Sequence, residues 1–200
     1  MRYFEMKQAV ELLANEWNLG KKECGATGDI CAWIYLFSVL EESEKIVTYK
    51  DGRRLVGFAG YSKNNSKKHL SKKKIYRFIK NELYKSKDIK DLNALKEYEN
   101  NYDYLPQELK EHFDGEVSIL IVDKNCRGKN IGKNLLLQVF ELAKKDNMKN
   151  LQILTDESCN YKFYESCGCE KIYETIVKNQ EYGKLGETLK EKAFIYEKKL

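Results

Sequence analysis

Apolar side chains recur at helical spacing within residues 1–40. One stripe is formed by Met6, Val10, Leu13 and Trp17, and a second by Ile30, Trp33, Phe37 and Leu40. Intervals of three and four residues place each stripe on one face of a helix, so the pattern predicts two helices. Gly20 supplies an end for the first helix. The second is apolar nearly all round, which predicts that it is deeply packed.

A hairpin is predicted next, with strands at 45–50 and 53–61, because Asp51-Gly52 between them favours a tight turn. Further along, the pattern predicts a central strand, a long helix, a strand, a short helix and two closing strands, at 116–122, 131–146, 150–155, 160–167, 170–177 and 193–199. The first three of these form a crossover unit, which pairs its strands in parallel. Residues 178–192 are expected to be a linker.

Residues 62–114 are expected to be a helical insertion in a single domain that spans residues 1–200. Between Lys63 and Lys90, basic residues exceed acidic ones by nine. Helices are predicted through Ile75–Leu83, over 88–100 and over 106–113, the last beginning at Pro106. Two interpretations stay open for this segment. It is either a solvated flap with snorkelling lysines, or a surface for an anionic partner or the rim of a cofactor site.

The composition is 42% hydrophobic and 34% charged, with one proline, which is typical of one ordered, soluble domain. A net charge of +5 suits an anionic cofactor but is too small to indicate nucleic acid. The longest apolar run, Ile30–Leu40, is far shorter than the about 20 residues that span a bilayer. The N-terminus shows no signal peptide. We therefore expect a cytoplasmic protein without a membrane segment.

Six cysteines are present, but they form no C-x-x-C pair. In a reducing compartment they are expected to be free structural thiols. Cys167-Gly168-Cys169 with Cys159 and two histidines is a weak metal signal, so no metal is expected.

One stretch, Gly115–Lys133, carries the clearest candidate chemistry. An apolar strand runs into a turn and a glycine-bearing loop, which opens a long helix. Such a loop can direct backbone N–H groups at an anion, and the helix N-terminus adds its positive dipole. The stretch matches neither the Walker loop nor the full dinucleotide-binding pattern. Taken alone, it is equally compatible with glycines that serve only a tight turn.

Two motifs resemble those of the GNAT N-acetyltransferase superfamily. The first reads Arg127-Gly128-Lys129-Asn130-Ile131-Gly132-Lys133 and then Leu135-Leu136, where the family usually has R-G-x-G-I-G-x-x-L-L. The second reads Phe163-Tyr164-Glu165-Ser166-Cys167-Gly168-Cys169, which is similar to F-Y-E-x-x-G-F. The order of predicted helices and strands also agrees over about three quarters of the chain, leaving out the insertion.

The resemblance implies an α+β fold. A mixed, mostly antiparallel sheet would be splayed at the two parallel strands of the acetyl-CoA motif, with helices on both faces. This chain departs from the family at two positions. Asn130 replaces a glycine, and asparagine is the non-glycine residue that best tolerates left-handed angles. Cys169 replaces a phenylalanine, which we interpret as a packing change.

Site residues follow from the resemblance. The pyrophosphate of coenzyme A would be held by Arg127, Gly128, Lys129, Asn130, Ile131, Gly132 and Lys133. The pantetheine arm and the oxyanion would be bonded by the backbone at Leu120, Ile121 and Val122, with Asn160 also against the arm or positioning Tyr164. Tyr164 would protonate the leaving thiolate. The alternative is that Tyr164 only lines the apolar face of a short helix.

The acceptor amine must lose a proton before it attacks. Glu116 is the first candidate for the base, acting through water, with Asp156 and Glu157 as alternatives. A third alternative is that no side chain acts as the base. Cys159 as an acyl-carrying nucleophile is disfavoured, because the family uses direct attack.

The resemblance implies an N-acetyltransferase that moves the acetyl group of acetyl-CoA to a primary amine on a small molecule or peptide. The acceptor itself is not indicated, and a homodimer is left open. One alternative function is a basic module that binds nucleic acid or an acidic partner through the lysine-rich insertion. The other is transfer of a longer acyl group.

Overall fold

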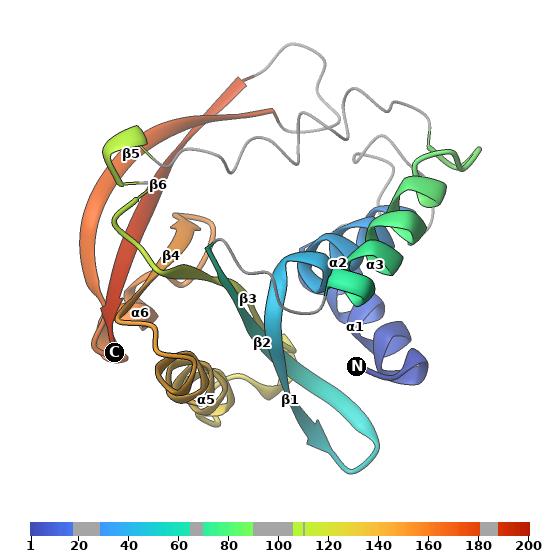
Figure 1. Ribbon diagram of the computed structural model, residues 1–200, viewed down its shortest axis with the longest axis horizontal. Coiled ribbons are helices and arrows are strands. Elements are labelled where there is room, and N and C mark those ends of the chain that lie inside the picture. Colours follow the sequence, from blue (N-terminus) through green and yellow to red (C-terminus); the bar gives the residue numbers. More distant parts are fainter. Residues whose placement is uncertain (18–28, 65–69, 90–105, 110, 181–187) are drawn as a thin grey trace.

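The computed structural model shows a six-stranded sheet with helices on both faces (Figure 1). It describes residues 1–17, 29–64, 70–89, 106–109, 111–180 and 188–200. The α-helices are α1 (Tyr3–Glu16), α2 (Ile30–Glu42), α3 (Leu70–Leu83), α5 (Ile131–Lys145) and α6 (Lys162–Ser166). The strands are β1 (Ser43–Asp51), β2 (Arg54–Lys63), β3 (Gly115–Val122), β4 (Asn150–Asp156), β5 (Glu170–Gln180) and β6 (Thr188–Lys199).

Strand order across the sheet is β1-β2-β3-β4-β6-β5, and every neighbouring pair is antiparallel except β3 with β4. The predicted fold class is therefore confirmed. The first hairpin turns at Gly52, whose φ of +58° is the left-handed angle that the Asp-Gly signal predicts. None of the helices in the described ranges has the length and hydrophobicity to cross a membrane.

The linker predicted over 178–192 is wrong. Most of it belongs to the β5–β6 hairpin, which stays paired as far as Gln180 opposite Thr188. The segment is polar, so its hydrophobicity did not mark it as strand. An antiparallel ladder needs only backbone groups, and these pair whatever the side chains are.

The helix predicted over 106–113 is also wrong, since the described residues of this segment form a 3-10 turn at Gln107–Leu109 and no α-helix. Asparagine side chains bond the backbone that follows. Asn64 Nδ2 donates to the carbonyl of Phe113 at 2.7 Å, and Asn150 Nδ2 donates to the carbonyl of His112 at 3.0 Å. These bonds fix the turn that leads into β3. Most of the helix predicted over 88–100 lies outside the described residues.

Two hydrophobic cores form, one on each face of the sheet. The first packs α1 and α2 against Ile119 and Ile121 of β3, and α3 joins it through Tyr76, Ile79 and Leu83. The second packs Leu135, Leu136 and Val139 of α5 against Leu151 and Ile153 of β4. Each aliphatic side chain so buried contributes roughly 1.5–3 kcal/mol. In Figure 1, α1, α2 and α3 lie to the right of β1 and β2, and α5 lies on the opposite side, to their left.

Ion pairs join α3 to α2 and to the start of β1. Lys73 lies 3.2 Å from Glu44, and Lys80 lies 2.9 Å from Glu41, which Arg77 also contacts. Burial alone would raise the pKa of the Glu41 carboxyl, but Lys80 and Arg77 outweigh it and lower that pKa. Part of the positive charge of this lysine-rich segment is thus neutralised within the fold.

β3 and β4 pair at only two positions, Gly115 with Leu151 and Glu116 with Gln152. Beyond them, and within the described residues, β3 pairs only with β2, and β4 pairs only with β6. The parallel strands therefore diverge, as the resemblance implies. Residues 117–122 present one backbone edge to the space between the two strands.

A register shift bends β3 just inside this divergence. Glu116 lies opposite Ser62 and Ile119 opposite Gly60, so three steps on β3 match two steps on β2. The shift changes the face to which alternate side chains point. Val117 packs in the second core, whereas Ile119 packs in the first.

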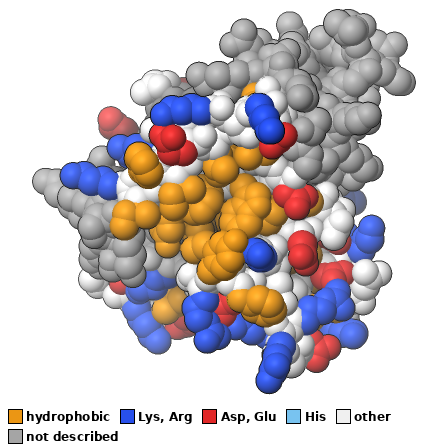
Figure 2. All heavy atoms as spheres, turned by 90° about the vertical axis from the view of Figure 1, so that its right-hand side faces the viewer, with side chains coloured by type: hydrophobic (Ala, Val, Ile, Leu, Met, Phe, Trp, Pro, Cys, Tyr) orange, Lys and Arg blue, Asp and Glu red, His pale blue; other side chains and the backbone are white. Residues whose placement is uncertain are grey.

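Hydrophobic side chains also gather on the outer face of α1, α2 and α3 (Figure 2). Tyr3, Phe4, Ile75 and Phe78 are 67%, 61%, 56% and 65% exposed. From the exposed Tyr3, ring contacts continue across the three helices to Trp33, then Phe37 and then Tyr76. The first core therefore extends to the surface on this side. Contiguous apolar surface of this kind is often found at contact sites.

An ion pair between Glu5 and Lys50 fixes the start of α1 to β1. The bond from Lys50, followed by the backbone N–H of Arg2, lowers the pKa of Glu5 to about 2. Because that pKa is depressed in the folded state, the pair stabilises the protein above the unfolded pKa of about 4.3. This contribution disappears as the pH falls through about 2.

We predict that Lys50→Met lowers the free energy of unfolding by about 1 kcal/mol near neutral pH, the usual scale of a partly exposed pair. The loss should shrink progressively as the pH is lowered below about 4. Urea unfolding of wild type and variant across this pH range measures the loss in the free energy of unfolding. The control is the same substitution in Glu5→Gln protein, which lacks the carboxylate of the pair. An equal loss at every pH would contradict the assignment.

Candidate functional site

The loop that follows β3 begins with a turn built on Asp123. Its Oδ1 accepts the backbone N–H of Asn125 at 2.9 Å, and its other oxygen pairs with Arg54. Burial alone would raise the pKa of Asp123, but the Asn125 N–H and the Arg54 charge outweigh it and lower that pKa. A second carboxylate, Glu16 of α1, accepts the backbone N–H of Lys124 at 3.0 Å. The turn is thereby fixed from two sides.

Two left-handed residues then carry the chain into α5. Gly128 has φ of +79°, and Asn130 has φ of 58° and ψ of 13°. The expectation that Asn130 adopts the conformation of the family glycine is confirmed. Its side chain makes no capping bond to α5. The first N–H groups of α5, from Ile131 to Lys133, consequently lack helical acceptors and remain available to an anion.

The three cations of the loop are not equivalent. Arg127 Nη2 lies 2.6 Å from Glu16 Oε2, and the Glu16 side chain is only 4% exposed. This guanidinium is therefore directed toward α1. Lys129 and Lys133 are exposed. The Glu16–Arg127 pair was not anticipated from sequence, because the two residues lie on elements far apart in the chain.

Three elements converge at the start of α5. A Cβ built on Gly132 would lie 3.5 Å from the Phe163 ring of α6 and 3.6 Å from Val122 at the end of β3. Of the predicted backbone ligands, Leu120 and Val122 are half-buried and Ile121 is buried in the first core. Alternate residues of a strand direct N–H and C=O to its open edge, here the edge away from β2.

Tyr164 lies on α6, half-buried beside this convergence. Its ring centroid is 5.5 Å from that of Phe163 and 5.7 Å from that of Tyr196. Burial raises the pKa of the Tyr164 phenol, and nearby cysteines and Asp156 add to the shift. The phenol is therefore neutral at physiological pH and keeps a proton to donate. No described residue forms a hydrogen bond with its hydroxyl.

Asn160 is placed differently from the prediction. α6 begins at Lys162 and not at residue 160, so Asn160 precedes the helix and is exposed. Its carbonyl accepts the N–H of Phe163 at 3.1 Å. The helical i−4 argument that placed Asn160 on the face of Tyr164 therefore does not hold.

Glu116 lies at the closed end of the divergence, on the last pair shared by β3 and β4. Gln152 Nε2 donates to Glu116 Oε2 at 2.9 Å. The alternative carboxylates follow β4 and serve its turn. Asp156 Oδ1 accepts from the N–H and hydroxyl of Ser158 at 2.9 and 2.5 Å, and Glu157 Oε1 accepts the N–H of Lys192 at 3.1 Å.

Gln152 is a site residue that sequence reasoning missed. It interrupts an apolar strand, NLQILT, and is only 8% exposed. A long polar side chain inside an otherwise apolar run was the available signal, since buried polar groups need partners.

Neither Cys159 nor Cys169 is an activated thiol. Within the described residues no disulfide forms among Cys31, Cys126, Cys159, Cys167 and Cys169, and Cys24 lies outside them. Partial burial and the Asp156 carboxylate raise the pKa of Cys159, and burial raises the pKa of Cys169 to about 12. Cys169 is buried in the second core. Within the described ranges, no three ligand-type side chains gather to hold a metal ion.

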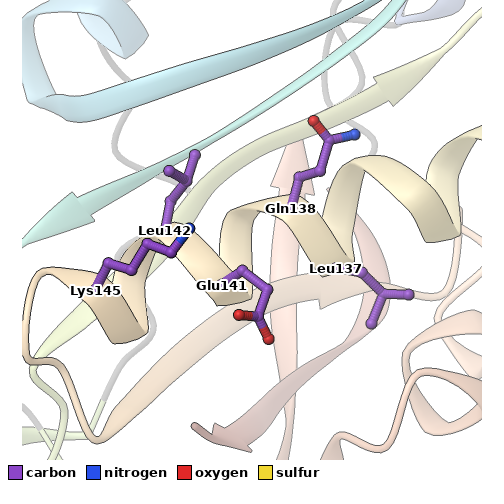
Figure 3. Close-up of a pocket in the computed structure, with 5 residues that line it drawn as sticks. All are labelled: Leu137, Gln138, Glu141, Leu142 and Lys145. Atoms are coloured by element: carbon purple, nitrogen blue, oxygen red, sulfur yellow. The ribbon is translucent and has the colours of Figure 1, made fainter.

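A hollow of about 310 Å³ lies elsewhere, on the outer side of α5 (Figure 3). It is lined by Leu137, Gln138, Glu141, Leu142 and Lys145. All five belong to the middle and C-terminal half of α5, beyond the loop at its N-terminus. This hollow is therefore separate from the candidate site.

Comparison with known proteins agrees with this geometry. Residues 92–169 match the sequence model of the Acetyltransferase (GNAT) family. A solved protein of Pyrococcus horikoshii OT3 is similar over 100% of this chain and 93% of its own, with 16% identity and a TM-score of 0.61. An aminoglycoside 6′-N-acetyltransferase complexed with coenzyme A is similar over 99% and 92%, with 14% identity and a TM-score of 0.57.

No curated protein sequence matches the chain. At such low identities the solved structures establish the fold alone. The family match covers β3, the loop, α5, β4 and α6, which are the elements that meet at the candidate site. The part of the chain that forms the candidate site is therefore similar to the GNAT acetyltransferase family.

Proposed function

We propose that this protein is an acetyl-CoA-dependent N-acetyltransferase that transfers the acetyl group to a primary amine by direct attack in a ternary complex. The observation that carries the proposal is the divergence of β3 from β4 directly beside an uncapped helix N-terminus. One end of the space can take a phosphate, and its edge offers backbone groups to an extended arm.

The described residues fit coenzyme A in their chemistry. The N–H groups at the start of α5, with Lys129 and Lys133, would bond the pyrophosphate. The open edge of β3 at Leu120–Val122 would bond the pantetheine arm as a strand bonds its neighbour. That a structural neighbour is complexed with coenzyme A supports this assignment.

Two side chains would move protons. Glu116 would accept a proton from the acceptor amine through water, freeing the lone pair to attack the thioester carbon. A backbone N–H of β3 would stabilise the oxyanion. As the C–S bond breaks, Tyr164 would give its proton to the leaving thiolate. Tyr164 holds a proton to donate at physiological pH, since burial raises the pKa of its phenol.

Two alternatives remain distinguishable. A basic interaction module is less favoured, because Lys73 and Lys80 are paired with acidic residues inside the fold. Transfer of a longer acyl group depends on the acyl pocket and is tested with acyl-CoAs of increasing length. The cytoplasmic location stays a prediction, and the identity of the acceptor and the homodimer stay open.

The first test is calorimetric titration with acetyl-CoA, followed by thiol release across a panel of amines. Saturable binding and amine-dependent release of coenzyme A are expected. High salt should weaken binding only modestly, in contrast to the steep loss typical of nucleic-acid binding. A protein that binds no acetyl-CoA would refute the proposal.

Asn130 provides a test of the phosphate loop. Asn130→Gly should retain acetyl-CoA affinity, because glycine adopts the left-handed angle freely. Asn130→Val should weaken binding about tenfold or more, since a β-branched residue is strained at φ of 58°. Calorimetry on both variants measures this. Equal affinities for the two would show that the loop backbone does not hold the phosphate.

Tyr164→Phe should lower kcat about a hundredfold, the scale of general acid catalysis, with acetyl-CoA affinity nearly unchanged. Tyr161→Phe is the matched control, because it removes a neighbouring phenol from the same region and should keep kcat. The loss should be smaller for an acyl donor whose thiol leaving group is more acidic. A fully active Tyr164→Phe enzyme would remove Tyr164 from the mechanism.

A further inference from the structure

The Gln152 side chain leaves a buried acceptor without a partner. Its Nε2 is used by Glu116, whereas its Oε1 has no hydrogen-bond donor among the described residues. The orientation of the amide is fixed by chemistry, since a reversed amide would put its oxygen against the carboxylate of Glu116. A buried carbonyl oxygen without a donor is unusual in a folded protein and indicates a missing partner.

The position of Gln152 connects it to the divergence of the strands. Leu151 and Ile153 pack in the second core, so Gln152 projects from the opposite face of β4, as Glu116 does from β3. The two residues form the last pair before the strands separate. The Glu116–Gln152 pair therefore marks the closed end of the space between the two strands.

The neighbouring buried carboxylate is already satisfied. Glu197 of β6 lies opposite Gln152 and is 6% exposed. His112 Nε2 lies 3.0 Å from its Oε1, and Asn150 Nδ2 donates to the same oxygen at 3.3 Å. The missing donor is therefore specific to Gln152 and is not a general feature of this row of polar residues.

We propose that Gln152 Oε1 and the Glu116 carboxylate form the subsite for the acceptor nitrogen and select primary amines. This inference rests on the proposed transferase function and names the residue that orients its acceptor. An ammonium group gives one proton to Glu116 through the intervening water and becomes a neutral amine with two N–H bonds. One N–H bonds Gln152 Oε1 and the other bonds the water held by Glu116, so the lone pair is left to face the thioester.

The same geometry predicts discrimination by substitution on nitrogen. A neutral secondary amine has one N–H and can satisfy only one of the two acceptors. A quaternary ammonium has none, although it carries the same charge as a primary ammonium. The subsite therefore reads N–H donors and not positive charge alone.

The test is a titration of the full chain with ethylammonium. The readout is the NMR signal of the Gln152 side-chain amide. Tetramethylammonium serves as the donor-free control. Ethylammonium should shift the signal saturably, and tetramethylammonium should not. An equal response to both cations, or no saturable response to ethylammonium, would overturn the inference.

Three variants separate an effect on binding from an effect on folding. In each, the affinity for ethylammonium is measured from the NMR signal of the Glu116 carboxyl group. Gln152→Met removes both polar atoms and should weaken ethylammonium binding at least tenfold, the loss expected for a hydrogen bond to a charged group. Gln152→Glu keeps an acceptor oxygen and should retain binding. Gln138→Met on the exposed face of α5 is the matched control and should change nothing. Unchanged affinity in Gln152→Met would refute the subsite.

Acetyl-CoA affinity and the kinetics of amine-dependent thiol release, measured on wild type and the same variants, distinguish the two proposals. If the subsite is wrong but the transferase function is right, Gln152→Met keeps wild-type KM for a primary amine. If the transferase function is wrong, wild type releases no thiol in response to any amine, whatever ethylammonium does to Gln152. With both correct, Gln152→Met raises KM for the amine while acetyl-CoA affinity and melting temperature stay near wild type.

Discussion

The short parallel contact between β3 and β4 is the constraint on which the arrangement of the site depends. Two paired positions join two antiparallel ladders at one end, and the ladders then separate. β4 is held along its whole length by β6, while β3 is held by β2. The second core spans both ladders beneath the separation. The divergence is thus maintained by packing and by pairing on the outer sides, not by contacts across it.

The loop at the open end depends mainly on backbone geometry. Gly128 and Asn130 take left-handed angles, and the start of α5 is left without a side-chain cap. Asp123 and Glu16 fix the preceding turn by accepting backbone N–H groups. The anion-binding capacity of the loop therefore comes from peptide groups, and its lysines add charge around them.

Much of the fold could be predicted from sequence, because its main elements carry strong local signals. The stripes of α1, α2 and α5, the Asp-Gly hairpin and the apolar run of β3 each report their structure within a few residues. The αL angle of Asn130 was also predictable, since asparagine is one of few residues that tolerate it. Polar strand extensions in β5 and β6 were not, because their pairing is a property of two distant backbones.

Side-chain contacts in the site were harder to anticipate for the same reason. Arg127 was expected to face phosphate, yet Glu16 lies beside it only because α1 packs near the loop. Gln152 lies where β3 and β4 stop pairing, and no local sequence pattern marks the end of that pairing. Asn160 was predicted to lie within the short helix, but α6 begins two residues later, at Lys162. Local pattern identifies elements, whereas tertiary packing decides which of their side chains meet.

The unpaired edge of β3 has a thermodynamic consequence. A ligand bound along that edge supplies hydrogen bonds that the sheet leaves unmade between residues 117 and 122, and so acts as a missing length of strand. Such a ligand, at free concentration c, raises the free energy of unfolding by RT ln(1 + c/Kd), because the unfolded chain offers no such edge. The melting temperature of the protein should then rise with the concentration of this ligand.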